Sequence, residues 1–214
     1  MKLTLEQRIQ KFKEVDIYPV ISSEFCNDRP VVQVLQSIAD GGAKIVQLRE
    51  KNMSKAKIFK LALEYRRLTA WHDMLLIIND HVDIAVAAGA DGVHLGQDDL
   101  PVFAAKKVDG SLLYGVSTHN VEEAEMAIAA GAGYINIGPV YPTQTKKVNC
   151  GALGLEMLDE VVKVTTVPFS VMGGIKEEKI PELLAHGAKH IAMVTEITQA
   201  EDITARVKAL RSRF

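Results

Sequence analysis

Acidic side chains follow two apolar runs in the middle of the chain. Leu75–Ile78 leads directly into Asn79 and Asp80, and Gly92–Leu95 leads into a turn that ends at Asp99. Short apolar runs between helical patterns indicate buried parallel strands, and neighbouring parallel strands bring their carboxyl ends to one rim. Two carboxylates at one rim suit Mg²⁺, which takes few protein ligands and completes its shell with water and phosphate oxygens. Alternatively, Asp80 and Asp99 cap the helices that follow them.

Other apolar runs of this kind also end in polar residues or glycine. These residues are Gln47, Arg49, Glu50, Lys51, Ser117, Thr118, His119, Thr143, Gln144, Thr145, Lys146, Gly173, Gly174 and Thr195. Cationic side chains, hydroxyl groups and backbone N–H groups freed by glycine all bind oxyanions. Beside a metal ion, they describe a site for a diphosphate. Each feature alone is typical of a solvated surface or a turn, so the prediction depends on their meeting at one rim.

The elements that must position these residues alternate along the whole sequence. Apolar runs that predict strands lie at 17–21, 45–48, 75–78, 92–95, 113–116, 134–137, 169–172 and 190–194, with helical patterns between them. Strict alternation with eight strands in 214 residues favours an α/β fold of the (β/α)₈ barrel type over an open doubly wound sheet. The active site of such a barrel lies at the carboxyl ends of its strands. We expect one domain over residues 1–214.

Two further patterns support the barrel. Thr4 and Gln7 have the spacing of a capping box, and an apolar face follows them as far as Val15, which predicts an extra helix before the first strand. This helix is expected to plug or flank the amino-terminal end of the barrel, opposite the site. Gly-Ala pairs also recur between a helix and a strand, at residues 42–43, 89–90, 131–132 and 187–188. Each glycine suits the left-handed position that ends a helix.

Composition excludes several classes of function. The net charge of −2 and the scattered Lys and Arg residues give no broad basic face for nucleic acid. No apolar run approaches the length of a membrane span or of a signal-peptide core, so we expect a cytoplasmic protein without a membrane partner. Cys26 and Cys150 lie far apart without a paired spacing, which suggests free thiols.

The motifs at the strand ends resemble those of the thiamine phosphate synthase (thiamine-phosphate pyrophosphorylase) family. In chain order they are Gln47–Lys51 (QLREK), Ile78–Asp80 (IND), Gly89–Asp99 (GADGVHLGQDD), Gly115–Ser117 (GVS), Gly138–Lys146 (GPVYPTQTK) and Gly173–Ile175 (GGI). They span nearly the whole chain. The resemblance implies a transferase that joins hydroxymethylpyrimidine diphosphate to thiazole phosphate and releases thiamine phosphate and diphosphate. It also implies small-molecule substrates, and it leaves the oligomeric state open, a homo-oligomer included.

The resemblance also implies roles for individual residues. Asp80 and Asp99 would hold Mg²⁺. The pyrimidine diphosphate would be bound by Gln47, Leu48, Arg49, Glu50, Lys51, Asn79, Ser117 and Lys146, and the thiazole phosphate by Thr143, Gln144, Thr145, Gly174, Val194 and Thr195. The implied mechanism is dissociative: diphosphate leaves first, and the thiazole nitrogen captures a pyrimidine methyl cation. Catalysis would then depend on Arg49, Lys51, Ser117 and Lys146, because fixed positive charge and hydrogen bonds stabilise the leaving diphosphate.

Two positions depart from the family pattern. The chain reads Met193-Val194-Thr195-Glu196 where the family usually shows serine followed by a small residue, and Met172 stands where isoleucine is common. We expect Glu196 to point away from the phosphate, toward Arg206 or Lys208, because like charges would repel. The alternatives are a TenI-like thiazole tautomerase or regulatory protein, and a non-catalytic barrel that binds a phosphate ligand. The TenI-like group typically lacks the metal-binding acids and the PTxTK loop, both of which this chain retains.

Overall fold

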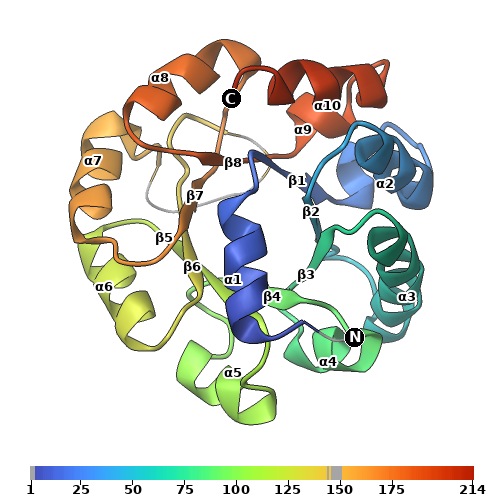
Figure 1. The fold of residues 1–214 in the computed structure, drawn as a ribbon, viewed down its shortest axis with the longest axis horizontal. Helices are drawn as coiled ribbons and strands as arrows, with labels where there is room; N and C mark the ends of the chain where they lie inside the picture. Colours follow the sequence, from blue (N-terminus) through green and yellow to red (C-terminus); the bar gives the residue numbers. More distant parts are fainter. Residues whose placement is uncertain (1–2, 144, 146–150) are drawn as a thin grey trace.

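The barrel wall consists of eight parallel strands that follow one another in sequence order, with β1 and β8 paired to close it (Figure 1). The structure is a computed structural model that describes residues 3–143, 145 and 151–214. Within these residues the strands are β1 Ile17–Ile21, β2 Ile45–Leu48, β3 Leu75–Asn79, β4 Gly92–Leu95, β5 Leu113–Thr118, β6 Tyr134–Ile137, β7 Phe169–Val171 and β8 His190–Met193. The predicted (β/α)₈ barrel is therefore confirmed.

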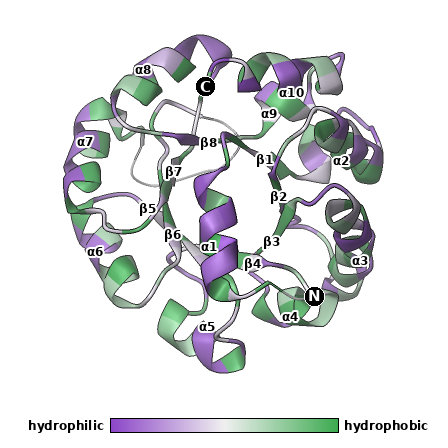
Figure 2. Cartoon of the chain, viewed as in Figure 1, coloured by the Kyte–Doolittle hydropathy of each residue, from purple (hydrophilic) through white to green (hydrophobic). Residues whose placement is uncertain are grey.

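Helices surround the barrel wall, and hydrophilic and hydrophobic residues alternate along them (Figure 2). In the described residues the α-helices are α1 Leu5–Lys13, α2 Val31–Asp40, α3 Lys55–Trp71, α4 Val82–Ala88, α5 Val102–Val108, α6 Val121–Ala129, α7 Gly154–Val164, α8 Ile180–Ala185, α9 Thr195–Thr198 and α10 Ile203–Arg211. Two 3₁₀ turns accompany them, η1 Ser23–Phe25 and η2 Glu177–Lys179. No helix in the described part of the chain is long and apolar enough to cross a membrane.

The helical pattern that the sequence shows between β7 and β8 is not one continuous helix in the structure. The segment 177–186 is a 3₁₀ turn followed by the short helix α8, in which Pro181 occupies the first turn. Proline suits that place because it lacks an N–H group. The closing helix expected from about Ala200 is α10, which Asp202 caps by accepting a hydrogen bond from the Ala205 N–H group, and the short helix α9 precedes it. The Gly-Ala prediction is confirmed, since the four glycines have φ angles of 88°, 65°, 89° and 83°.

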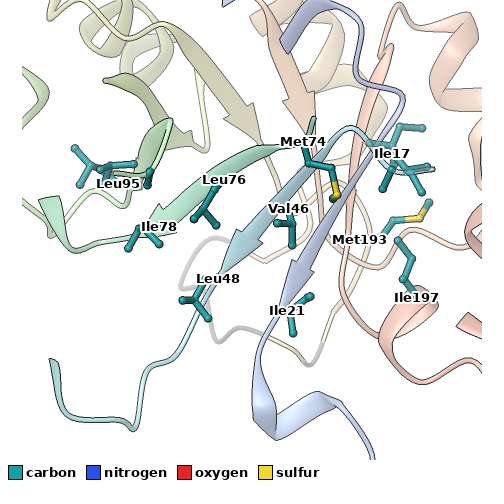
Figure 3. Close-up of a cluster of buried hydrophobic side chains, with 14 of the residues drawn as sticks. Ile17, Ile21, Val46, Leu48, Met74, Leu76, Ile78, Leu95, Met193 and Ile197 are labelled. Atoms are coloured by element: carbon teal, nitrogen blue, oxygen red, sulfur yellow. The ribbon is translucent and has the colours of Figure 1, made fainter. Parts of the chain in front are cut away.

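Side chains alternate between two hydrophobic cores because successive strand residues point to opposite faces. One core lies between the barrel wall and the helices, and Figure 3 shows Ile17 and Ile21 of β1 with Val46 and Leu48 of β2 in this cluster. The other core fills the barrel interior, and its strand members are Tyr18, Val20, Ile45, Leu75, Ile77, Leu113, Tyr134 and Ala192. The same alternation turns Gln47, Asn79, Ser117 and Asn136 inward.

Helix α1 lies across the amino-terminal end of the barrel (Figure 1). Thr4 and Gln7 form the predicted capping box. Phe12 is fully buried, and its ring stacks on Tyr134 with 4.3 Å between centroids. At the first residue of β8, the His190 Nδ1 atom lies 2.5 Å from the carbonyl oxygen of Val15. The prediction that this helix plugs the end opposite the site is therefore confirmed.

Candidate active site

Two carboxylates approach each other at the carboxyl ends of β3 and β4. Asp80 follows β3 directly, with a left-handed φ of 63°, and its Oδ2 atom lies 2.6 Å from Lys51 Nζ. Asp99 accepts a 2.6 Å hydrogen bond from the backbone N–H group of Gly96. Burial raises the pKa of Asp99, and the neighbouring Asp80 carboxylate raises it further. The two side chains are therefore close enough to repel each other.

The alternative that these carboxylates cap helices is wrong. Helix α4 begins after His81 and α5 begins after Pro101, and neither helix has a side-chain cap hydrogen bond. Asp80 and Asp99 thus have no capping role in the helices that follow them. Asparagine and aspartate tolerate the left-handed conformation better than most residues, which is compatible with Asp80 at this position.

The two carboxylates fit Mg²⁺. They offer hard oxygen donors from two consecutive strands, and a divalent cation would relieve the repulsion between them. In residues 3–143, 145 and 151–214 there is no cluster of three or more His, Cys, Asp or Glu side chains that could hold a metal ion. A site with two protein ligands suits an ion that completes its shell with water and phosphate oxygens.

The QLREK segment after β2 turns its side chains in different directions. Leu48 belongs to the outer core, so only its backbone can face a ligand (Figure 3). Glu50 is buried and accepts hydrogen bonds from the Ser23 N–H and hydroxyl groups, both at 2.8 Å. Arg49 is half-buried and has no hydrogen-bond or ion-pair partner for its side chain within the described residues. Arg49 and Lys51 therefore supply the positive charge of this segment.

A chain of buried hydrogen bonds crosses the barrel interior beneath the site. Gln47 Nε2 donates to Tyr18 Oη at 2.9 Å, and Tyr18 Oη lies 3.0 Å from Tyr134 Oη. His94 bridges Tyr134 Oη at 3.1 Å and Ser117 Oγ at 2.9 Å. Burial raises the pKa of both tyrosines, so their hydroxyls stay protonated and available as donors. The chain fixes Gln47 and Ser117 on opposite sides of the barrel mouth.

Sequence reasoning missed the two tyrosines of this chain. Tyr18 and Tyr134 lie within ordinary apolar strand runs, and nothing in those runs marks them as polar site residues. The available signal was the alternation of side chains along each strand, which places Tyr18, His94 and Tyr134 on the inward face. The closed register is needed to bring residues 116 positions apart, such as Tyr18 and Tyr134, into contact.

A cavity opens between the carboxyl ends of β5, β6, β7 and β8. Its lining includes six predicted site residues, which are Ser117, Thr143, Thr145, Gly174, Val194 and Thr195, and also Asn136, Met172 and Ala192. Gly174 has a φ of 63°, and an added Cβ would lie 2.3 Å from the Pro142 carbonyl oxygen. Only glycine allows the two loops to approach so closely. The predictions for Gln144 and Lys146 fall outside the described residues.

Glu196 also lines this cavity, but its carboxylate is neutralised by cations. It forms an ion pair with Arg206, as predicted, and a second with Lys176 at 2.8 Å. His119 is held by Glu123, whose Oε2 atom accepts a hydrogen bond from the His119 N–H group and lies 2.7 Å from Nδ1. His119 lies between β5 and α6 and lines the cavity there.

Known proteins with similar sequences span nearly the whole chain. A family model described as thiamine monophosphate synthase matches residues 17–197. The thiamine-phosphate synthase of Lawsonia intracellularis is 43% identical over 199 residues, which are 92% of each chain. That of Caldicellulosiruptor saccharolyticus is 40% identical over 211 residues, 98% of this chain and 96% of the relative.

Solved structures agree with the sequence comparison. Thiamine phosphate pyrophosphorylase from Pyrococcus furiosus superposes with a TM-score of 0.86 and 32% identity, over 94% of this chain and 95% of that one. A 3-hexulose-6-phosphate synthase superposes with a TM-score of 0.67 and 22% identity, and that likeness concerns the fold alone.

Proposed function

This chain belongs to the thiamine monophosphate synthase family and is a transferase of thiamine biosynthesis, and from that premise we propose how its two substrates are held and joined. One substrate is 4-amino-2-methyl-5-hydroxymethylpyrimidine diphosphate, and the other is thiazole phosphate. Their union gives thiamine phosphate and diphosphate. One observation supports the proposal most strongly. Asp80, Asp99 and Lys51 meet beside β3 and β4, and the β5–β8 cavity opens at the same end of the barrel.

The pyrimidine diphosphate occupies the half of the mouth formed by β2–β5. Arg49 and Lys51 lie where the diphosphate is expected, and Ser117 is held in place by His94. Charge-assisted hydrogen bonds from these cations would bind the diphosphate oxygens. The full proposed set is Gln47, Leu48 and Glu50 through their backbones, Arg49, Lys51, Asn79, Ser117 and Lys146, of which Lys146 rests on the sequence alone.

The thiazole phosphate occupies the β5–β8 cavity. Its phosphate lies at the rim, against Gly174 and the Val194–Thr195 turn, where backbone N–H groups would donate to it. Thr143 and Thr145 face the same cavity, and their hydroxyl oxygens lie 2.9 Å apart. Gln144 joins this set from the sequence alone. The two substrates therefore meet between Ser117 and the floor of the cavity.

The reaction requires charge stabilisation rather than a nucleophilic side chain. Asp80 and Asp99 would hold Mg²⁺, which supplies Lewis-acid stabilisation to diphosphate oxygens when bound. Arg49, Lys51 and Lys146 place fixed positive charge where the leaving diphosphate gains negative charge. Ser117 orients the diphosphate, and the thiazole nitrogen then attacks the methylene carbon of the pyrimidine cation.

Omitting one substrate at a time separates this function from the alternatives. Purified protein with Mg²⁺ is incubated with both substrates, with either one alone, and with neither, and thiamine phosphate and diphosphate are measured together. We expect both products in equal amounts only when both substrates are present. A tautomerase or a binding barrel would form no diphosphate under any of these conditions. The cytoplasmic location, the single domain over residues 1–214 and a homo-oligomeric state stay predictions.

A further inference from the structure

Asn136 of β6 is a buried polar side chain without an evident structural role. Its side chain lines the β5–β8 cavity, and the residue is 2% exposed. Its Oδ1 atom is buried and has no hydrogen-bond partner in the described part of the chain. Unpaired buried acceptors destabilise a folded protein, so each one calls for an explanation, and a bound ligand is one such explanation.

A neighbouring residue, Ser170, is buried and unpaired within the described residues like Asn136 but does not line the cavity. Ser170 of β7 is the register partner of Asn136, and its Oγ atom is also buried without a partner among the described residues. Ser170 is absent from the cavity lining, however, whereas Asn136 is part of it. Asn136 and Ser170 are therefore both buried and both lack a hydrogen-bond partner for one side-chain atom in the described part of the chain, but only Asn136 can contact a ligand in the cavity.

The position of Asn136 places it beside the ring of the second substrate rather than its phosphate. On β5 its register partner is Ser117, which the proposed function assigns to the first substrate. Asn136 lies two residues before Gly138, where β6 has ended. It is therefore about 6.6 Å deeper in the barrel than the end of the strand. If Gly174 and Thr195 bind the phosphate at the rim, the thiazole ring of the same substrate occupies the floor of the cavity.

Charge appears on that ring during the proposed reaction. The carbon–oxygen bond to diphosphate breaks with its electron pair, and the pair leaves on the diphosphate. The thiazole nitrogen then gives its lone pair to the methylene carbon, so a carbon–nitrogen bond forms and the neutral ring becomes a thiazolium cation. No proton is transferred in this sequence.

We propose that the Asn136 carboxamide oxygen stabilises the positive charge that develops on the thiazole ring, an inference that rests on the proposed function. The amide can turn about its Cβ–Cγ bond and present either its oxygen or its NH₂ group to the cavity. An oxygen dipole fixed in a buried site interacts strongly with charge formed beside it. A neutral amide also suits this position better than a carboxylate, which would compete with the thiazole nitrogen for the pyrimidine cation.

The test compares ligands whose rings differ in charge. Thiamine phosphate carries the thiazolium cation, whereas thiazole phosphate carries a neutral ring, so their dissociation constants report on the charge directly. Both are measured by calorimetry for the wild type, for Asn136→Leu and Asn136→Ala, and for Ser170→Ala as the matched control. Turnover numbers and melting temperatures are measured on the same preparations.

We expect Asn136→Leu to bind thiamine phosphate about tenfold more weakly and to turn over at least about tenfold more slowly, while thiazole phosphate affinity stays within about threefold. Its melting temperature should equal or exceed that of the wild type, because an unpaired buried acceptor is removed. Ser170→Ala should leave both affinities unchanged.

Three results would overturn the inference. They are unchanged turnover in both Asn136 variants, equal weakening of the two ligands, and a fall in melting temperature in both variants, which would indicate a structural asparagine. A wild type without turnover on both substrates would instead refute the proposed function, so the two failures are distinguishable.

Discussion

Individual residues give the two halves of the barrel mouth a different distribution of charge. Lys51 and Arg49 stand beside the Asp80–Asp99 pair, and Lys51 contacts Asp80 directly. On the other side, the Glu196 carboxylate is neutralised by Lys176 and Arg206. A diphosphate with a metal ion and a monophosphate with a neutral ring would require this difference.

The charge of Asp80 is expected to be essential, whereas its shape is not. Asparagine tolerates the left-handed φ of Asp80, so Asp80→Asn removes the charge without straining the turn. We expect turnover to fall roughly a thousandfold, which corresponds to about 4 kcal/mol of transition-state stabilisation. Asp83→Asn is the control, because Asp83 pairs with Lys55 at the surface, where both side chains are more than 60% exposed. Near-normal turnover in Asp80→Asn would contradict the proposed metal site.

Glu196 is expected to act on stability rather than on binding. Because its carboxylate is paired with Arg206 and Lys176, Glu196→Ala should change the Michaelis constant for thiazole phosphate by less than about threefold. Glu177→Ala is the matched control, since Glu177 also pairs with Arg206 but does not line the cavity. A Michaelis constant lowered by tenfold or more would show that the Glu196 carboxylate repels the bound phosphate.

At the scale of elements, helix α1 fixes the closed end of the barrel and supports the interior that lies under the site. Phe12 stacks on Tyr134, and Tyr134 belongs to the hydrogen-bond chain that ends at Ser117. Arg8 of the same helix is buried and donates to the Ser111 carbonyl oxygen. Packing at one end of the barrel is thus connected to Ser117, which we propose binds substrate, near the other end.

Phe12 is expected to contribute most of the stability that α1 provides. Phe12→Ala should lower the free energy of unfolding by about 3–5 kcal/mol, because it leaves a cavity beside Tyr134. Phe103→Ala on α5 is the control, since that ring is 60% exposed and should cost less than about 0.5 kcal/mol. Urea denaturation measures both free energies of unfolding. Equal effects of the two substitutions would contradict the prediction that α1 stabilises the barrel through Phe12.

The contact between α1 and His190 predicts a pH dependence. Burial lowers the pKa of His190 below 6.5, and the nearby Lys189 charge lowers it further. The Val15 carbonyl and Asp16 raise the pKa, but they do not reverse the effect of burial. The unfolded chain therefore binds a proton at a higher pH than the folded one, and stability is lost as pH falls below about 6.5. We expect the melting temperature to fall between pH 7.5 and 5.5 more steeply in the wild type than in His190→Gln. Parallel curves would rule out this contribution.

At the scale of the whole molecule, the sequence was sufficient for the fold because each strand and helix carries its own local signal. The apolar runs predicted the strands, and the barrel followed from their strict alternation. Pro181 lies inside the helical pattern of residues 177–186, so its local effect was not anticipated.

The candidate site could be predicted where its residues lie at the carboxyl ends of strands or in the loops that follow them. Asp80, Asp99 and Lys51 carry charges that stand out there, and the structure brings them together. Tyr18, Tyr134 and Asn136 lie within strands, where only the closed register shows which side chains meet inside the barrel. Gln144 and Lys146 rest on the sequence, since they fall outside the described residues.

We expect this barrel to couple diphosphate release to thiamine phosphate formation, with Mg²⁺ held by Asp80 and Asp99. The most direct measurement is a time course of both products after the two substrates are mixed with metal-free protein, with Mg²⁺ then titrated in. We expect no product before Mg²⁺ is added. After its addition, thiamine phosphate and diphosphate should form in equal amounts, at a rate that saturates with Mg²⁺ and falls again on chelation. Equal rates with and without Mg²⁺, or diphosphate released without thiamine phosphate, would contradict it.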